Sequence, residues 1–222
     1  MSCSDESAFP DAGSVLRRAP VVPVLTIPDL DCALPLAEAL VSGGLPVLEI
    51  TLRTAAGLGA IRAIADAVPG AIVGAGTVRS AAEFEAAVDA GSRFVVSPGL
   101  TEGLIAAATR SSVPLIPGIA TASELMRARE AGFDHVKFFP AEAAGGVATL
   151  KALGGPFPDM RFCPTGGVSL ANIADYLALD AVVTVGGTWM TPADDVRSGN
   201  WPAIRELAAG AAEKVRSIRS PS

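Results

Sequence analysis

One lysine beside an aromatic ring is the residue of this chain best suited to covalent chemistry. In the run 135–140, apolar residues surround a single cation, and Pro140 ends the run because proline cannot donate to a sheet ladder. The two-residue period of a strand places His135, Lys137 and Phe139 on one face. Burial disfavours the charged ammonium, so an amine held there can attack a carbonyl carbon and form a Schiff base. The alternative is a structural lysine that reaches the surface or pairs with an acid.

A carboxylate and a guanidinium share one face of a second apolar run. Glu49 and Arg53 lie an even number of residues apart in the run 47–53, so strand alternation points both side chains the same way. Together with an inward lysine, this pattern indicates that Glu49 transfers protons and that Arg53 clamps a substrate carboxylate. The structural alternative is an ion pair that fills the interior, since buried charges survive only when paired.

The elements that must hold these side chains alternate along the chain. Apolar runs bounded by Gly or Pro predict eight strands, at 21–27, 46–50, 71–75, 94–97, 114–116, 135–139, 161–163 and 181–185. Alanine-rich segments at helical spacing lie between them, at 33–42, 58–68, 81–90, 102–109, 122–131 and 170–179. The alternation indicates an α/β protein with a parallel sheet, and the strand count favours a single closed (β/α)8 TIM barrel. An open doubly wound sheet competes, but it would normally carry a G-x-G-x-x-G turn after its first strand, and 28–30 contains no glycine.

Two regions follow from the barrel prediction. Residues 1–20 are interpreted as a tail and a short covering helix near 15–18, and residues 21–222 as the catalytic barrel domain. Local signals predict helix caps at Asp29, Ser80, Thr101, Thr121 and Ser169, capping boxes with Glu83 and Glu124, and left-handed glycines at Gly91 and Gly132.

Paired glycines follow the last two predicted strands. In such barrels the active site lies at the carboxyl ends of the strands, and phosphate is often held after strands seven and eight. Gly166-Gly167 and Gly186-Gly187 occur at these two positions, where they would expose backbone N–H groups beside helix N-termini. This indicates phosphate binding, and the alternative is a pair of tight turns.

Composition excludes several classes of partner. The net charge is −6 and no stretch gathers the basic residues, so no nucleic acid is expected. No apolar run is long enough to span a membrane and the N-terminus lacks a signal pattern, which predicts a cytoplasmic protein. Three widely spaced cysteines and one histidine predict reduced thiols, no metal and no cofactor.

Several motifs in fixed order now resemble one known family. The runs are 48–53 (LEITLR), 74–77 (GAGT), 97–100 (SPGL), 117–118 (PG), 137–142 (KFFPAE) and 163–167 (CPTGG). From about Pro20 to Leu207 the chain resembles the 2-keto-3-deoxy-6-phosphogluconate (KDPG) and 4-hydroxy-2-oxoglutarate (KHG) aldolases, which are class I aldolases. The resemblance implies cleavage of KDPG, a keto-acid sugar phosphate of the Entner–Doudoroff pathway, to pyruvate and D-glyceraldehyde 3-phosphate by a homotrimer.

The resemblance also implies a role for each site residue. Lys137 would be the Schiff-base nucleophile and Glu49 the general acid and base. The pyruvate part and its carboxylate would be bound by Arg53, Thr77, Pro98, Phe139 and Thr165, and the phosphate by Gly166, Gly167, Gly187 and Thr188. Thr188 departs from the family's usual serine, which keeps the hydroxyl but adds a methyl group near the phosphate.

Other residues are interpreted as structural. His135 is expected in the bottom layer of the barrel, Glu142 as the cap of a helix, Trp189 and Trp201 as packing residues, and Cys163 as an inert thiol. Two other hypotheses stay open: a phosphate-binding isomerase or synthase that uses acid–base chemistry without a covalent step, and a catalytically silent sugar-phosphate-binding barrel.

Overall fold

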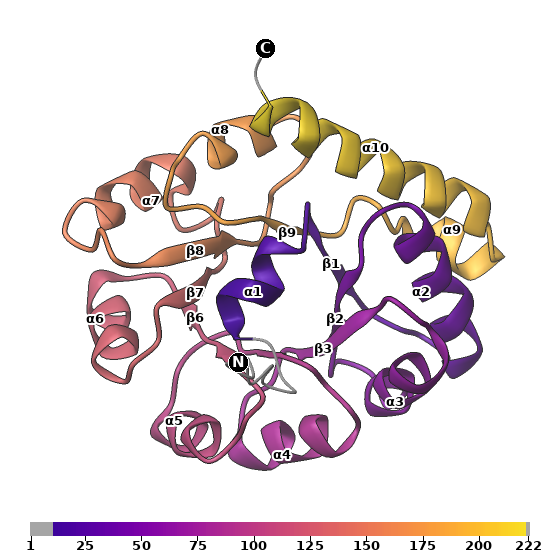
Figure 1. Ribbon diagram of the computed structural model, residues 1–222, viewed down its shortest axis with the longest axis horizontal. Helices are drawn as coiled ribbons and strands as arrows, with labels where there is room; N and C mark the ends of the chain where they lie inside the picture. Colours follow the sequence, from indigo (N-terminus) through magenta and orange to yellow (C-terminus); the bar gives the residue numbers. More distant parts are fainter. Residues whose placement is uncertain (1–10, 221–222) are drawn as a thin grey trace, which may run out of the picture.

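Strands and helices alternate through the computed structural model, which describes residues 11–220 (Figure 1). The strands are β1 (Val22–Leu25), β2 (Val47–Thr51), β3 (Ile72–Gly76), β4 (Val95–Val96), β5 (Leu115–Ile116), β6 (Gly118–Ile119), β7 (His135–Phe138), β8 (Arg161–Pro164) and β9 (Gly186–Gly187). The helices are α1 (Ala12–Arg17), η1 (Leu30–Cys32), α2 (Ala33–Ser42), α3 (Gly57–Ala67), α4 (Ala81–Asp89), α5 (Glu102–Thr109), α6 (Ala122–Glu130), α7 (Gly146–Gly154), α8 (Ile173–Leu177), α9 (Ala193–Ser198) and α10 (Trp201–Arg219). The tail predicted for the first ten residues lies outside the described part.

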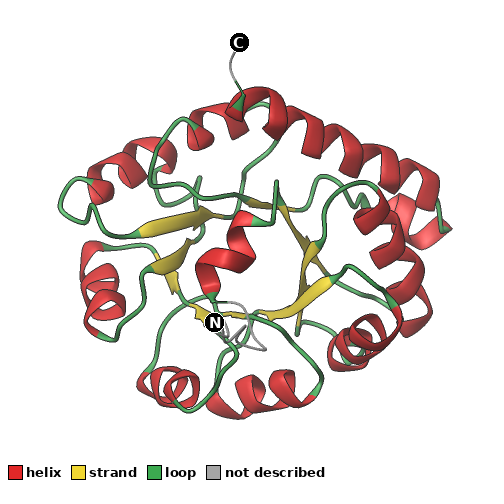
Figure 2. Cartoon of the chain, in the orientation of Figure 1, coloured by secondary structure: helices red, strands yellow, loops and turns green. Residues whose placement is uncertain are grey.

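All strand pairs are parallel, and the strands form two sheets. One sheet has the order β5-β4-β3-β2-β1-β9 and the other the order β6-β7-β8. Isolated parallel bridges join Phe162 to Val182 and Thr165 to Gly186, so the β8 side of the small sheet also meets the chain around β9. The helices α2 to α10 lie on the outside of the strands (Figure 2). The predicted parallel α/β architecture is therefore confirmed.

Apolar side chains are buried in two places. The larger cluster lies between the strands and the outer helices, as expected for parallel strands covered by helices. The smaller cluster joins Val15 and Leu16 of α1 to side chains of several strands, among them Val47, Phe94 and Cys163. Helix α1 therefore packs against the strands on the side away from the outer helices.

Most predicted helices lie where the patterns indicated. Helices α2 and α5 match their predictions residue for residue, and α3, α4 and α6 match within one residue at either end. The segment predicted at 170–179 is shorter, because α8 covers only Ile173–Leu177. Helices α9 and α10 were not predicted, and for α7 only a start near Glu142 was predicted.

Local turn chemistry explains the ends of these helices. Ser80, Thr101 and Thr121 each accept a hydrogen bond from the helix backbone, and the capping box of Thr121 with Glu124 is complete. Gly91 and Gly132 have φ of 95° and 89°, which confirms their left-handed conformation.

Three of the capping predictions need correction. Asp29 caps the short helix η1, and Glu83 bonds the backbone N–H of Arg79 instead of closing a box with Ser80. Ser169 was predicted as a cap, but Asn172 precedes α8 and its side-chain oxygen accepts from the Ser169 N–H.

The strand predicted at 181–185 is wrong. Only Val182 forms a bridge there, and β9 consists of Gly186 and Gly187. The segment changes partner along its length: the N–H of Val183 donates to Phe162, while the carbonyl of Val185 accepts from Val22. This change of partner prevents a continuous ladder.

Candidate active site

The central feature of the site is a contact between Lys137 and Glu49. Lys137 lies in β7 and Glu49 in β2, which belong to different sheets. The lysine Nζ lies 2.9 Å from Oε1 and 3.2 Å from Oε2 of the carboxylate. Only 8% of the lysine side chain and 3% of the glutamate side chain are exposed. A buried charge is costly without a partner, and this contact is short enough for direct proton transfer.

The aromatic ring of Phe139 lies over the amine, as the strand alternation predicted. Its centroid is 5.4 Å from Nζ of Lys137, within the range of a cation–π contact. The half-buried ring follows the last residue of β7. It therefore forms an apolar wall beside the amine.

The glycine at position 76 makes room for the glutamate. A Cβ at Gly76 would lie 2.3 Å from Oε1 and 2.5 Å from Cγ of Glu49. The glycine pairs with Thr51 in the adjacent strand, so its missing side chain leaves the space that the carboxylate fills. The glycine at position 76 of this run is thus required by the position of Glu49 itself.

Thr77 has an unusual backbone conformation. Its φ is 61°, and it is the only non-glycine residue with positive φ in the described part of the chain. Such a conformation costs about 1–3 kcal/mol and is concentrated at functional sites. The strain places this half-buried residue directly after β3, at the same end of the strands as Glu49.

Arg53 lies outside the buried pair. Strand β2 ends at Thr51, and Arg53 is exposed in the turn that follows, so the alternation that was expected to align Arg53 with Glu49 stops before it. Within residues 11–220 its guanidinium forms no ion pair. The cation is available at the carboxyl end of β2.

Pro98 approaches the lysine from the loop after β4. Gly118 pairs with Lys137, and a Cβ at Gly118 would lie 2.4 Å from the carbonyl carbon and oxygen of Pro98. The loop is held in place by Ser97, whose hydroxyl donates to the carbonyl of Gly99 at 2.7 Å. Backbone at Pro98 therefore packs directly against the strand next to the lysine.

The first pair of predicted phosphate-binding glycines lies in a tight turn after β8. Gly166 and Gly167 have φ of 100° and 83°, a conformation that side chains rarely adopt. Thr165, which precedes them, is buried and pairs with Gly186. The sequence predicted a helix N-terminus directly beside this turn, but helix α8 begins only at Ile173.

The second pair forms β9 itself rather than a turn after a strand. Gly187 pairs with Pro23, and a Cβ at Gly187 would collide with the ring of Trp189. Thr188 is exposed, and its carbonyl accepts from the N–H and the hydroxyl of Thr191. Helix α9 begins at Ala193, so it does not follow this pair directly in the sequence.

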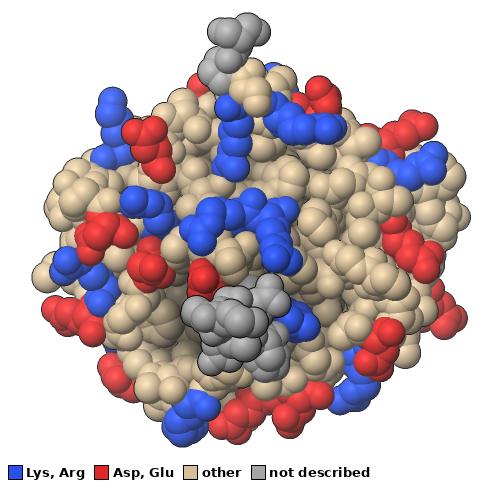
Figure 3. All heavy atoms as spheres, viewed as in Figure 1, with Lys and Arg blue, Asp and Glu red and all other residues tan. Residues whose placement is uncertain are grey.

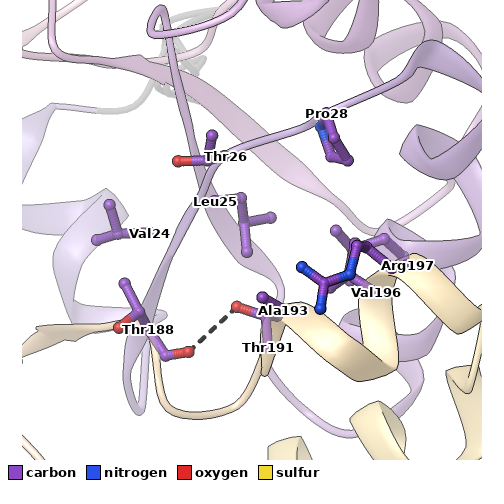
Figure 4. A pocket seen from close by; sticks show the side chains of 10 residues that line it. Val24, Leu25, Thr26, Pro28, Thr188, Thr191, Ala193, Val196 and Arg197 are labelled. Carbon is purple, nitrogen blue, oxygen red and sulfur yellow. Dashed lines mark hydrogen bonds between the residues drawn. The ribbon is translucent and has the colours of Figure 1, made fainter.

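A pocket of about 310 Å³ lies beside Thr188 (Figure 4). Val24 and Thr26 of the β1 region line one part of it, and Arg197 extends toward it from α9. Arg197 also contacts the carboxylate of Asp194. Thr188, which was predicted to bind phosphate, thus lies beside this pocket, and the guanidinium of Arg197 extends toward the same pocket.

Cys163 is a buried neighbour of the lysine in the sheet. It pairs with Lys137 across β7 and β8, and burial raises the pKa of its thiol to about 12. A buried thiol that stays protonated at neutral pH agrees with the inert role expected of Cys163. No three metal-ligating side chains cluster within the described residues, and none of the described helices is long and apolar enough to cross a membrane.

Glu142 and Tyr176 form a support that the sequence analysis missed. The Tyr176 hydroxyl donates to the Glu142 carboxylate, and burial together with this carboxylate raises the pKa of Tyr176. The N–H of Glu142 donates to the carbonyl of Gly166 at 3.0 Å. Glu142 was predicted to cap a helix, but α7 begins only at Gly146. The sequence offered one signal of this pair, because Tyr176 is the only tyrosine of the chain.

His135 and the tryptophans have structural positions. His135 lies at the start of β7, where its ring lies close to Gly13 of α1, consistent with the predicted bottom layer. Trp189 and Trp201 are partly buried against the main core. The packing roles predicted for both tryptophans are confirmed.

Comparison with known proteins gives a consistent answer. The family described as KDPG and KHG aldolase matches residues 12–207. A KHG/KDPG aldolase of Escherichia coli K12 is 54% identical over 202 residues, which cover 91% of this chain and 95% of the relative. A 2-dehydro-3-deoxy-phosphogluconate aldolase of Pseudomonas aeruginosa is 52% identical over 206 residues, 93% of this chain and 94% of the relative.

Solved structures agree with the sequence comparison. A KDPG aldolase of Legionella pneumophila, captured with pyruvate as a covalent carbinolamine intermediate, superposes with a TM-score of 0.88 at 47% identity, covering 90% of this chain and 97% of that one. A Zymomonas mobilis aldolase solved with 3-phosphoglycerate gives 0.85 at 47% identity, with 90% and 93% coverage. On this combination of a buried lysine–glutamate pair and close relatives over nearly the whole length, the chain belongs to the KDPG and KHG aldolase family.

Proposed function

We propose that this chain is a class I aldolase that cleaves KDPG to pyruvate and D-glyceraldehyde 3-phosphate and also acts on KHG. The observation that carries the proposal is the buried contact of 2.9 Å between Nζ of Lys137 and Glu49. An amine next to a carboxylate in a dry site has both the nucleophile and the base that imine chemistry needs. The Legionella relative trapped as a carbinolamine supports the same chemistry.

Imine formation begins with proton transfer from Lys137 to Glu49. The free amine attacks the C2 ketone of the substrate, and the carbinolamine that forms loses its hydroxyl group as water. Glu49 supplies the proton that makes this hydroxyl group leave. The ring of Phe139 lies against the developing iminium and excludes water from that side.

Carbon–carbon cleavage uses the imine as an electron sink. A base removes the proton of the C4 hydroxyl, the C3–C4 bond breaks, and its electron pair forms an enamine on Lys137. Glu49, directly or through a water, acts as this base and then returns the proton to C3. Hydrolysis of the resulting pyruvate imine restores the lysine.

The two ends of the substrate are held by different elements. Arg53 and Thr77, from the ends of β2 and β3, bind the carboxylate, and the guanidinium fork suits that group. Pro98 and Thr165 line the pyruvate part beside the lysine. The phosphate lies against Gly166, Gly167, Gly187 and Thr188, and its binding energy holds the reacting carbons in register.

The proposal also covers the closure of the barrel, the oligomeric state and the location of the enzyme in the cell. The two sheets are two arcs of one closed (β/α)8 barrel with α1 as its covering helix; the bridges at Val182 and Gly186 and the inner apolar cluster around Val15 support this closure. The enzyme acts as a homotrimer in the Entner–Doudoroff pathway of the cytoplasm, where the free thiols of Cys32 and Cys163 would stay reduced.

Borohydride reduction in the presence of pyruvate, followed by intact mass and peptide mapping, tests the covalent step. We expect one reduced adduct per chain, located on Lys137. The chain has only two other lysines, Lys151 and Lys214, and both are exposed. Lys151→Ala and Lys214→Ala are therefore matched controls. An unmodified native chain, or a chain still modified after Lys137→Ala, would reject the Schiff-base assignment in favour of non-covalent acid–base chemistry or a silent binding barrel.

A further inference from the structure

A second polar cavity lies at the opposite end of the strands from Lys137. Its volume is about 470 Å³, and four basic side chains line it. They come from four elements: Arg17 from α1, His135 from the start of β7, Arg161 from the start of β8 and Arg219 from the end of α10. His135 and Lys137 share one strand but stand two residues, or about 7 Å, apart along it. This cavity is therefore separate from the site of the proposed aldol reaction.

Two of the arginines use backbone carbonyls as their hydrogen-bond acceptors. Arg161 donates to the carbonyls of Pro158 and Met160, and Arg219 donates to the carbonyl of Val183. Neither forms an ion pair with a carboxylate within residues 11–220. Burial lowers the pKa of Arg219, as expected for a guanidinium that has lost water without gaining an anion.

His135 adds a buried nitrogen without a partner. Its Nδ1 lies 2.7 Å from the Asp134 carboxylate, whereas its Nε2 is buried with no hydrogen-bond partner in the described part of the chain. A Cβ at Gly13 would lie 2.8 Å from this Nε2 and 2.9 Å from Nη1 of Arg17. The imidazole and the guanidinium thus border the same small space, which exists because residue 13 has no side chain.

Three carboxylates also line the cavity, and two of them contact a basic side chain. Asp134 contacts His135, and Asp159 pairs with Arg129 at 2.6 Å. Asp180 is the remaining carboxylate of the lining. Lysine and arginine side chains form a band across the centre of this face, with acidic side chains mostly toward its edge (Figure 3). In a chain of net charge −6, three guanidinium groups around one cavity are a local concentration of cations, although three aspartates share the lining.

We propose that this cavity binds a small phosphate monoester. Guanidinium forks match phosphate oxygens, and several of them around one dianion offset its loss of hydration. The cavity is larger than an inorganic ion needs, so it also has room for a short hydroxyl-bearing carbon chain, and Asp180 offers an acceptor for a hydroxyl group. The proposal does not depend on the aldolase reaction.

Calorimetric titration of the full-length chain with glycerol 3-phosphate at low ionic strength tests the proposal. We expect a saturable site whose affinity falls by about tenfold in Arg17→Gln and in Arg219→Gln, since each loses one charge-assisted hydrogen bond. Arg205→Gln, an exposed arginine of α10 outside the cavity, is the matched control and should bind like the native chain.

A third variant tests whether filling the space beside Gly13 blocks binding. Gly13→Ala places a methyl group within 2.9 Å of both His135 and Arg17, so it should weaken binding. Because this contact also overpacks the buried ring of His135, we expect a lower melting temperature as well, and binding is measured well below that temperature. Thr188→Val perturbs only the proposed active-site phosphate position and should leave this site intact. Absence of binding, or binding that Thr188→Val abolishes and Arg17→Gln does not, would overturn the proposal while leaving the aldolase assignment untouched.

Discussion

The space that Gly76 leaves for Glu49 gives the sharpest prediction. In Gly76→Ala, the new methyl carbon would lie 2.3 Å from Oε1 and 2.5 Å from Cγ of Glu49. Ordinary contact between these atoms begins near 3.4 Å, so the carboxylate must move by about 1 Å. A displacement of this size costs on the order of 100-fold in rate, or about 2.7 kcal/mol of transition-state stabilisation.

Two measurements check this effect. A coupled assay of pyruvate release from KDPG should show kcat reduced by about 100-fold, and urea denaturation should show a loss of about 1–3 kcal/mol from overpacking. Gly210→Ala is the matched control, because a Cβ there meets nothing within 4 Å and the residue lies in helix α10. It should retain full activity and gain slightly in stability.

A double-mutant cycle identifies the cause. In the Glu49→Ala background the colliding side chain is absent, so Gly76→Ala should cost little stability there. If Gly76→Ala destabilises both backgrounds equally, or if the single variant keeps kcat within about twofold of the native value, the steric reasoning is wrong.

Further substitutions test the other parts of the site. Lys137→Arg should abolish turnover, because guanidinium stays protonated and cannot form an imine; retained KDPG cleavage would count against the mechanism. Thr188→Val should raise KM for KDPG more than for KHG, which lacks the phosphate, and equal effects in steady-state kinetics would place the phosphate elsewhere. Tyr176→Phe should also raise KM for KDPG more than kcat falls, because Glu142 then supports the turn after β8 less firmly; a change in kcat alone would exclude this positioning role. The Cys163 thiol, with a pKa of about 12, should resist iodoacetamide in the native chain at pH 8 and react only after unfolding, as followed by peptide mass.

Local signals were enough to predict much of the secondary structure. The Thr121–Glu124 capping box and the glycines at 91 and 132 act over three or four residues, and the structure reproduces them. Helix α10 was missed although Ile204, Ala208 and Val215 are buried at helical spacing, because alanines give a weak apolar stripe. The failed strand at 181–185 depended on partners more than 150 residues away, such as Val22.

Residue types pointed to imine chemistry at the site but left structural alternatives open. A lysine flanked by apolar residues and stopped by proline pointed to a buried amine, and Phe139, the residue directly after β7, does lie beside that amine. Strand alternation alone does not place Arg53, because β2 ends at Thr51 and Arg53 lies in the turn beyond it.

Long-range packing supplied what these patterns lacked. Lys137 and Glu49 are 88 residues apart, and their strands are not neighbours in either sheet, so no local rule could set the 2.9 Å between them. That distance comes from side chains that point across the space between two sheets, and from a glycine in a third strand, β3, that leaves room for the carboxylate. Short stretches of chain were enough to single out the lysine and the glutamate, whereas their contact exists only because the tertiary structure brings β2 and β7 to face each other.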